Sequence, residues 1–264
     1  MTSSAPFDMT APLAGGGRIP LLGFGTWQIR GEQARQAVGW ALETGYRHID
    51  TATLYRNEAE VGAAVAANGT AREELFLTTK IQPRSAGQEQ RTLRQSLEGL
   101  RTDYLDLWLI HWPPPDGIGA GMWRQLIGAR EQGLAHTIGV SNYSLDQLDQ
   151  LSHETGVTPE VNQIEWSPFL YDPAVAEGHR ERGIVLEGYS PFRASRLDHP
   201  VLTAIAERHG KQPAQVIVRW HLQHGFVVIP KSARKERIEA NAAVGDFDLT
   251  DDDMRALDGL GPRR

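Results

Sequence analysis

The 264-residue chain contains no cysteine. This absence excludes disulfide bonds, thiolate catalysis, iron–sulfur clusters and cysteine-based zinc sites. It fits a reducing compartment, and we expect a cytoplasmic protein. No apolar run in the sequence approaches the roughly 18 residues that suggest a membrane-spanning helix. The opening MTSSAPFDMTAPLAGGG lacks the charged and apolar regions of a signal peptide, so we expect no association with a membrane.

An excess of charge of one sign is also lacking. Aspartate and glutamate number 33 against 27 lysines and arginines, which gives a formal net charge of −6. A mildly acidic chain is a poor candidate for nonspecific binding to nucleic acids, so we expect no such partner. Hydrophobic residues make up 40% of the chain, which is enough to build a core.

From Ile19 onward, short β-type runs alternate with polar loops and helical stretches. Eight β-type runs are present: LLGFGTW (21–27), YRHIDTA (46–52), LFLTTK (75–80), YLDLWLIH (104–111), HTIGVSN (136–142), EVNQIEW (160–166), IVLEGYS (184–190) and FVVIPKS (226–232). Helical stretches include 31–45, 88–100, 145–156 and 213–225, and several end at a glycine, a common C-terminal helix signal: Gly45, Gly133, Gly156, Gly183 and Gly225. Eight such units in this length predict a closed (β/α)8 TIM barrel.

We expect one barrel domain over residues 1–264. Residues 1–18 are mostly small, polar and glycine-rich, and we predict a flexible or turn-like N-terminal segment there. The run PPPDGIGAG (113–121) is predicted to be a loop, because three consecutive prolines fit neither a helix nor a central strand.

Three ionisable residues end consecutive β-type runs. Asp50, Lys80 and His111 follow one another at intervals of about 30 residues, the length of one βαβ unit. Active sites of such barrels form at the carboxyl ends of the strands, and adjacent strands lie about 4.8 Å apart. The three side chains should therefore converge, and Tyr55 in the loop after Asp50 can fold over the same spot.

These four residues suit acid–base chemistry. The pKa of a phenol is about 10, and a nearby ammonium lowers it. Asp50 would keep Lys80 charged, so that Tyr55 could protonate a developing alkoxide while His111 orients the same oxygen. The sequence leaves open a structural alternative, in which Asp50 and Lys80 form a buried ion pair that only stabilises the barrel. A reduction would also need a cofactor, because no side chain supplies a hydride.

A basic cluster after the last β-type run indicates a cofactor site. Its members are Lys231, Ser232, Arg234, Lys235 and Arg237. TIM barrels often bind phosphate near the seventh and eighth strands, and helix N-terminal amides add to the positive potential. The expected ligand is the 2′-phosphate of a dinucleotide. A solvated helix face is the alternative, above all for Arg234 and Lys235.

Other strand ends carry less specific residues. Ser141, Asn142 and Gln163 could bind a carboxamide, although satisfied structural groups explain them equally well. Tyr189 could stack on a flat ring or belong to the core.

Two pairs of residues give weak indications. Trp27 and Trp112 could line a substrate pocket or fill the barrel. His221 and His224 lie on one predicted helix, but no third ligand is evident, so we predict a surface helix and no metal site.

Together these segments resemble the aldo-keto reductase family. The matching segments run in order from about Ile19 to Leu249: GFGTW (23–27), YRHIDTATLYRNEAEVG (46–62), TTK (78–80), DLWLIHWP (106–113), IGVSN (138–142), VNQIEW (161–166), GYSPF (188–192) and IPKS…RI…N (229–241). The sequence is most similar to small bacterial members of the 2,5-diketo-gluconate reductase type. The resemblance implies a (β/α)8 barrel and an oxidoreductase that reduces small aldehydes and ketones with NADPH.

The resemblance also implies roles for individual residues. Its catalytic tetrad falls on Asp50, Tyr55, Lys80 and His111. Its cofactor contacts fall on Gly25, Thr26, Ser141, Asn142, Gln163, Tyr189, Ser190, Lys231, Ser232, Arg237 and Asn241. Its substrate-pocket aromatics fall on Trp27 and Trp112. It implies no metal, and we expect a monomer.

Three departures from the family pattern bear on specificity. Ala240 stands where the family commonly has an acidic residue that holds the adenine, so adenine affinity should be reduced or achieved differently. The loop 113–121 is short, and only GPRR follows Leu260, where the family has a long loop over the substrate. We therefore expect an open pocket with loose discrimination among carbonyl compounds.

Two other functions are consistent with parts of the pattern. A barrel lysine can form a Schiff base, so Lys80 could serve an aldolase, although Asp50 would keep it protonated. A cofactor-bound module that senses redox state with slow turnover is the second alternative, which the complete tetrad disfavours.

Overall fold

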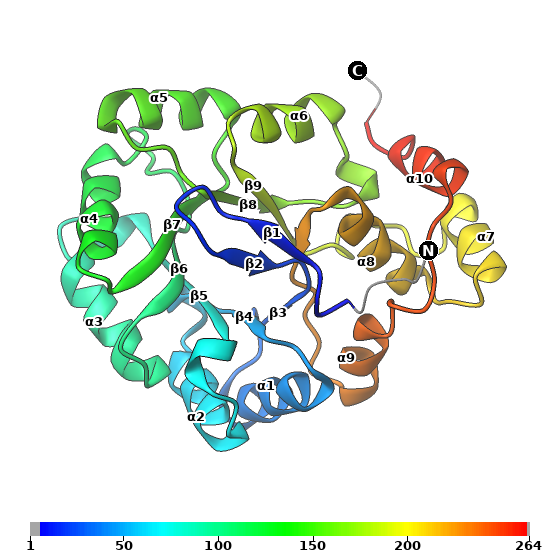
Figure 1. Cartoon of the computed structure of the whole chain (residues 1–264), viewed down its shortest axis with the longest axis horizontal. Coiled ribbons are helices and arrows are strands. Elements are labelled where there is room, and N and C mark those ends of the chain that lie inside the picture. Colours follow the sequence, from blue (N-terminus) through cyan, green and yellow to red (C-terminus); the bar gives the residue numbers. More distant parts are fainter. Residues whose placement is uncertain (1–5, 263–264) are drawn as a thin grey trace.

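A computed structural model describes residues 6–262. Its centre is an eight-stranded parallel sheet surrounded by helices (Figure 1). The strands of this sheet are β3 (Gly23–Gly25), β4 (His48–Asp50), β5 (Phe76–Ile81), β6 (Leu105–Ile110), β7 (Ala135–Ser141), β8 (Val161–Glu165), β9 (Val185–Tyr189) and β10 (Val227–Val228). Each lies within or almost within one of the eight expected runs, and the predicted (β/α)8 TIM barrel is confirmed.

The sheet closes between its first and last strands. Neighbours pair in sequence order from β3 to β10, and a parallel bridge then joins Leu22 to Val228. The Val228 amide donates to the carbonyl of Leu21 at 2.8 Å. Gly25 must lack a side chain here, because a Cβ atom would lie only 2.8 Å from the carbonyl oxygen of Ile229. This close approach brings the chain after β10 beside the ends of β3 and β4.

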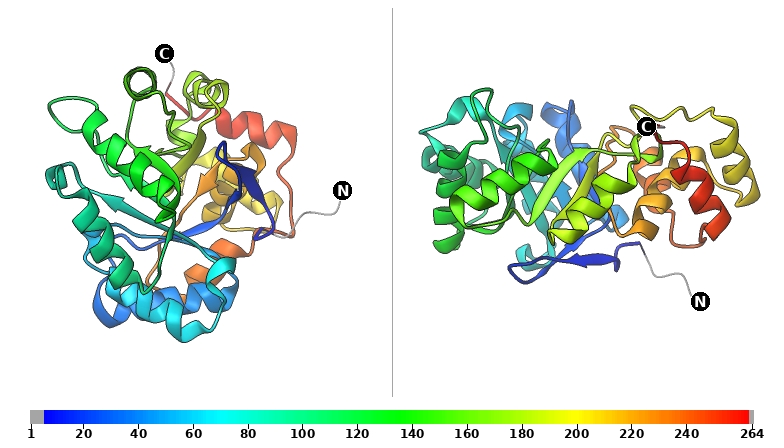
Figure 2. Two further views of the ribbon diagram at one scale, coloured as in Figure 1. Left: turned by 60° about the vertical axis from the view of Figure 1, so that its left-hand side comes forward. Right: turned by 90° about the horizontal axis from the view of Figure 1, so that it is seen from above.

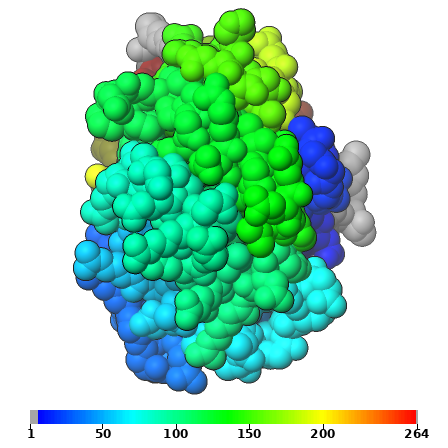
Figure 3. Space-filling model, turned by 90° about the vertical axis from the view of Figure 1, so that its left-hand side faces the viewer, coloured from blue at the N-terminus to red at the C-terminus, as the bar shows by residue number. Residues whose placement is uncertain are grey.

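Helices form a layer around the strands (Figure 2). They are α1 (Gly31–Thr44), α2 (Glu58–Asn68), α3 (Glu89–Leu100), α4 (Ala120–Glu131), α5 (Leu145–Thr155), α6 (Pro173–Glu181), α7 (Pro200–Arg208), α8 (Pro213–His224), α9 (Lys235–Ala242) and α10 (Asp251–Asp258). The side that carries α3, α4 and α5 presents a continuous outer surface in cyan and green (Figure 3). Within residues 6–262, no helix has the length and apolar character needed to cross a membrane.

The four helical stretches expected from the sequence correspond to α1, α3, α5 and α8. The loop predicted over 113–121 stops two residues early, because α4 begins at Ala120. The main core lies between strands and helices, where large side chains such as Trp108, Trp123 and Trp220 are fully buried.

A hairpin covers the end of the barrel at which the strands begin (Figures 1 and 2). It consists of β1 (Thr10–Pro12) and β2 (Arg18–Pro20), which pair antiparallel. The Gly15 amide in its turn donates to the carboxylate of the buried residue Glu160 at 2.6 Å, just before β8. For residues 10–18 this replaces the predicted flexible or turn-like segment with an anchored hairpin, while residues 1–5 lie outside the described part of the chain.

The prediction that His221 and His224 lie on a surface helix is wrong for His221. His221 is fully buried, and its ring nitrogens lie 2.8 Å and 3.3 Å from the carbonyl oxygens of Ile217 and Trp166. The reason is that α8 is buried on most of its circumference, since every residue from Gln215 to Leu222 is buried. His224 is partly exposed and lies 2.8 Å from Asp258.

Candidate active site

A cavity of about 770 Å³ opens at the carboxyl ends of the strands, opposite the hairpin. Twelve of the predicted site residues line it: Gly25, Trp27, Asp50, Tyr55, His111, Trp112, Ser141, Asn142, Gln163, Tyr189, Ser190 and Lys231. Trp27 and Trp112 are 41% and 48% exposed, so both indoles stand at the surface of the molecule and neither fills the barrel. The structure thus gathers residues from seven strand ends around one space.

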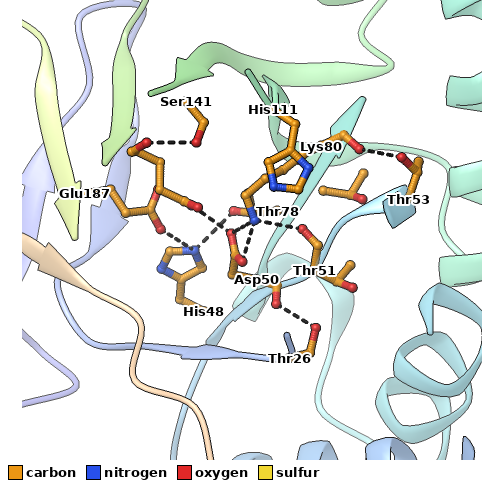
Figure 4. Close-up of polar contacts among 12 residues, drawn as sticks. Thr26, His48, Asp50, Thr51, Thr53, Thr78, Lys80, His111, Ser141 and Glu187 are labelled. Atoms are coloured by element: carbon orange, nitrogen blue, oxygen red, sulfur yellow. Dashed lines mark hydrogen bonds and ion pairs between the residues drawn. The ribbon is translucent and has the colours of Figure 1, made fainter. Parts of the chain in front are cut away.

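Asp50, which lines this cavity, forms a buried ion pair with Lys80 (Figure 4). The Nζ atom of Lys80 on β5 is 2.6 Å and 2.7 Å from the two carboxylate oxygens of Asp50 at the end of β4, and 2.9 Å from the carbonyl oxygen of Thr51. Burial alone lowers the pKa of Lys80, but the charge of Asp50 outweighs it and the pKa is raised. Lys80 therefore remains an ammonium at neutral pH.

Further hydrogen bonds hold Asp50 in place. The Nε2 atom of Gln163 donates to its carboxylate at 2.9 Å, and the Thr26 hydroxyl donates to its carbonyl at 3.0 Å. Thr26 is fully buried and does not line the cavity. Thr26 therefore contacts the backbone of Asp50 and does not face the cavity that a ligand would occupy.

Tyr55 and His111 complete the cluster. Tyr55 ends the short helix η1 (Thr53–Tyr55), and the Lys80 ammonium lies 5.3 Å from the centre of its ring. The rings of Tyr55 and His111 meet edge to face, with centres 5.7 Å apart. All four residues expected to converge from their spacing are therefore close together at one end of the barrel.

Burial changes the protonation of both rings. It raises the pKa of Tyr55, and the opposing effect of the Lys80 charge is smaller, so the net shift is upward and not the lowering expected from the ammonium alone. Burial and the same ammonium lower the pKa of His111 to about 3. At neutral pH Tyr55 is a protonated phenol and His111 a neutral imidazole.

The polar residues at the ends of β7, β8 and β9 form a connected network. The Ser141 hydroxyl donates to the Gln163 carbonyl at 2.8 Å, and the Asn142 amide donates to the Ser141 hydroxyl at 2.9 Å and to the His111 carbonyl at 3.1 Å. The Tyr189 hydroxyl donates to the side-chain oxygen of Asn142 at 2.8 Å. These side chains have structural partners and also line the cavity.

The basic cluster divides into two parts. Lys231 lines the cavity, whereas Arg237 is exposed on the first turn of α9. Ser232 is buried, and its hydroxyl accepts a hydrogen bond from the Arg234 amide at 3.1 Å just before that helix. Asn241, one turn after Arg237, is also buried. Lys235 points to Glu43 on α1, with a separation of 3.8 Å.

Seven further residues line the cavity without having been singled out in the sequence: Gln28, Leu54, Glu165, Pro191, Phe192, Arg193 and Ile229. Phe192 ends the GYSPF motif and Arg193 follows it, so their place next to matched residues could have indicated them. Glu187 was also missed, although it is fully buried on β9 inside the barrel. Its position as the one acidic residue in the β-type run IVLEGYS (184–190) was the only feature of the sequence that could have indicated it.

Comparison with known proteins gives a consistent result. The model of the Aldo/keto reductase family matches residues 21–262. An aldo-keto reductase of Mycolicibacterium smegmatis is 45% identical over 249 residues, which span 93% of this chain and 90% of the relative. One from Mycolicibacterium vanbaalenii is 46% identical over 264 residues, with 98% and 94% coverage.

Solved structures agree in fold. The crystal structure of an aldo/keto reductase from Brucella melitensis has a TM-score of 0.92 at 43% identity, covering 95% of this chain and 98% of that one. A Bombyx mori aldo-keto reductase in complex with NADP has a TM-score of 0.89 at 36% identity, with 96% and 92% coverage.

Proposed function

This chain belongs to the aldo/keto reductase family, and on that premise we propose that it reduces aldehydes and ketones with NADPH, with Tyr55 as the proton donor. Nicotinamide-dependent reduction of small carbonyl compounds is the chemistry of the family. The observation that carries the finer proposal is the meeting of Tyr55, the Lys80–Asp50 ion pair and neutral His111 at one cavity.

Tyr55 is the proton donor in this proposal. Because burial raises its pKa, the phenol carries its proton at neutral pH and can give it to the oxygen of a carbonyl group that is being reduced. The Lys80 ammonium favours the phenolate that remains after donation. Asp50 keeps that ammonium charged and fixed in position. The ion pair therefore supports the acid without entering the reaction itself.

His111 orients the substrate oxygen. Its pKa of about 3 leaves the imidazole uncharged, so it can hydrogen-bond a carbonyl oxygen without competing with Tyr55 as an acid. Two groups, the phenol and the imidazole, then meet the oxygen at the place where negative charge develops.

The residues around the cavity fit a nicotinamide dinucleotide. Tyr189 gives an aromatic face in the wall, Asn142 and Gln163 give amides, and Lys231 with Arg237 gives positive charge where α9 begins. Lys231 and Arg237 would hold the 2′-phosphate, with Ser232 beside them, and Asn241 would lie on the adenine side. When bound, the nicotinamide supplies the hydride that no side chain can provide.

The exposed indoles of Trp27 and Trp112 support an open substrate pocket. Two flat apolar side chains at an accessible rim contact many substrates in similar ways, so we propose loose discrimination among small carbonyl compounds.

The ion pair between Lys80 and Asp50 argues against the aldolase alternative. Its ammonium is bound to two carboxylate oxygens, whereas a Schiff base requires a free amine.

The test is a panel of aldehydes and ketones with purified protein, followed by the loss of NADPH absorbance and repeated with NADH. We expect turnover of several compounds and a higher kcat/KM with NADPH. Failure of every compound to oxidise NADPH would contradict the proposal. Covalent trapping of a ketone on Lys80 by borohydride would instead favour the aldolase.

A further inference from the structure

A second buried acid lies in the barrel close to the Asp50–Lys80 pair. Glu187 on β9 pairs in register with Gln163 on β8 and with Val227 on β10, and it is completely shielded from solvent. Its carboxyl group points into the barrel beside His48 and Asp50 (Figure 4). The proposed mechanism makes no use of it.

Neither carboxyl oxygen of Glu187 has a hydrogen-bond partner within residues 6–262. The nearest ionisable contact is the Nε2 atom of His48, which lies 3.7 Å from Oε1, beyond hydrogen-bond distance. That nitrogen is 3.1 Å from the hydroxyl of Thr78. An ionised carboxylate without partners in such a place would be very costly, so Glu187 holds a proton under neutral conditions.

The electrostatic surroundings agree with this protonation state. Burial, helped by the charge of Asp50, outweighs the opposing effects of the Lys80 charge and the Gln163 side chain and raises the pKa of Glu187 to about 8. Burial lowers the pKa of His48 to about 3, so this imidazole is neutral and cannot act as a counter-ion. The charge of Lys80 is already matched by Asp50. The buried cluster therefore holds one cation and one anion near neutral pH.

The ionisable groups that interact with Glu187 come from three parts of the barrel. His48 and Asp50 lie on β4, Lys80 lies on β5, and Tyr55 follows β4. Gln163, its neighbour on β8, does not titrate. Glu187 is thus the member of this group whose charge changes in mildly alkaline solution.

We propose that Glu187 is a positioning residue that acts on Tyr55 through the buried charges of the cluster and sets the alkaline limit of proton donation. This inference rests on the proposed function. A charge on Glu187 raises the pKa of both Tyr55 and Lys80. When Glu187 ionises, the phenol therefore keeps its proton to higher pH. Removing the carboxyl group should make Tyr55 lose its proton at a lower pH.

The test is the Glu187→Gln variant, which keeps the shape of the side chain but cannot ionise. We expect kcat/KM for reduction near pH 7 to stay within about threefold of wild type, because both side chains are neutral there. The alkaline loss of kcat/KM should move down by about one pH unit. If kcat/KM of the variant fell at the same alkaline pH as that of wild type, the inference would be overturned.

Glu160→Gln is the matched control. Glu160 is also a buried carboxylate, but it lies at the opposite end of the barrel, where it accepts a hydrogen bond from Gly15. Its replacement should leave the pH profile unchanged. A shift of equal size in this control would show that any buried carboxylate has the same effect, and would also overturn the inference.

A measurement without turnover separates this inference from the proposed function. Alkaline ultraviolet titration of tyrosine, with the Tyr55→Phe signal subtracted, reports the ionisation of Tyr55 in the protein without substrate. The same downward shift should appear in Glu187→Gln, whether or not any carbonyl compound is reduced. An unmoved titration overturns the inference even in an active enzyme.

A second variant keeps the inference testable if Glu187→Gln does not fold. Glu187→Leu should give the same shift as Glu187→Gln, because the charge and not a hydrogen bond carries the effect. If neither variant folds, the carboxyl group is structural and the inference is overturned.

Discussion

Lys231 differs from the other charged residues of the basic cluster in where it lies. Lys231 lines the cavity, and Arg237 is exposed on the first turn of α9. Lys235, between them in sequence, points instead to Glu43. The division of this cluster into a cavity side and an outer side could not be predicted from sequence, because it depends on the angle at which α9 leaves β10.

We predict that alanine at Lys231 or Arg237 weakens NADPH binding selectively. Loss of one charge-assisted hydrogen bond to a phosphate should raise the Kd for NADPH about tenfold or more and leave that for NADH nearly unchanged. Cofactor fluorescence titration measures both values. Lys235→Ala is the control and should change neither. Equal losses for the two cofactors in the Lys231 or Arg237 variants would contradict a phosphate site here.

Among the single residues, the convergence of those proposed to be catalytic was the easiest to predict. Asp50, Lys80 and His111 end consecutive strands, and the register of a parallel barrel brings such ends together. The protonation of Tyr55 was harder to foresee. Its direction depends on how deeply the ring is buried, which the order of residues does not reveal.

At the scale of elements, glycine marked the ends of helices reliably. Gly45, Gly156 and Gly225 are the C-cap residues of α1, α5 and α8, and each adopts a left-handed backbone with φ of 114°, 73° and 75°. The hairpin of β1 and β2 was missed because its strands span three residues each and precede the strand–helix repeat that located the equally short β3 and β4. Without such a repeat, strands that short give too little alternation to be recognised in the sequence.

Among the described residues, Asp253 is one of two carboxylates that attach α10 to neighbouring helices, the other being Asp258, which bonds Trp220 and His224 of α8. Asp253 closes the capping box of this helix with Thr250 and also pairs with Arg208 and His209 from the end of α7. Its hydrogen bonds with His209, Arg208 and Thr250 outweigh burial and hold its pKa well below the ordinary 3.8. A carboxyl group with a lowered pKa stabilises the folded state above its unfolded value, and this effect disappears as the pH falls through the folded value.

We therefore predict that Asp253→Asn lowers the free energy of unfolding by about 1–2 kcal/mol at neutral pH. The difference from wild type should shrink as the pH falls below 3.8, because the Asp253 carboxyl of the unfolded chain then binds a proton while that of the folded state stays charged, which removes stability from wild type alone. Urea denaturation across a pH series measures both effects. Asp252→Asn, an exposed change on the same turn, should cost less than about 0.5 kcal/mol. A constant difference at all pH values would contradict the assignment.

For the molecule as a whole, closure is the feature that organises the rest. Each strand pairs with two neighbours, and the bridge between Leu22 and Val228 joins the first strand to the last. The eightfold repeat made this architecture predictable. The cavity wall was less so, because residues such as Arg193 reach it from a loop whose path no periodicity specifies.

We propose that the barrel is one domain and predict that it unfolds as one unit. No group of adjacent strands can leave a closed sheet without exposing two new edges. Tryptophan fluorescence reports all seven tryptophans, of which Trp108, Trp123 and Trp220 are fully buried on β6, α4 and α8. Its urea transition should coincide with that of far-ultraviolet circular dichroism. Two separated transitions would show that part of the barrel unfolds independently.

The Tyr55→Phe variant probes the proposed joint action of an acid, an ion pair and an imidazole at one end of the barrel. We predict that kcat for NADPH-dependent carbonyl reduction falls by about 10²–10⁴-fold, because the proton donor is lost. The Kd for NADPH should stay within about threefold of wild type, because the cofactor contacts remain. A variant that binds NADPH normally and keeps most of its turnover would contradict the role of Tyr55 and, with it, this account of the site.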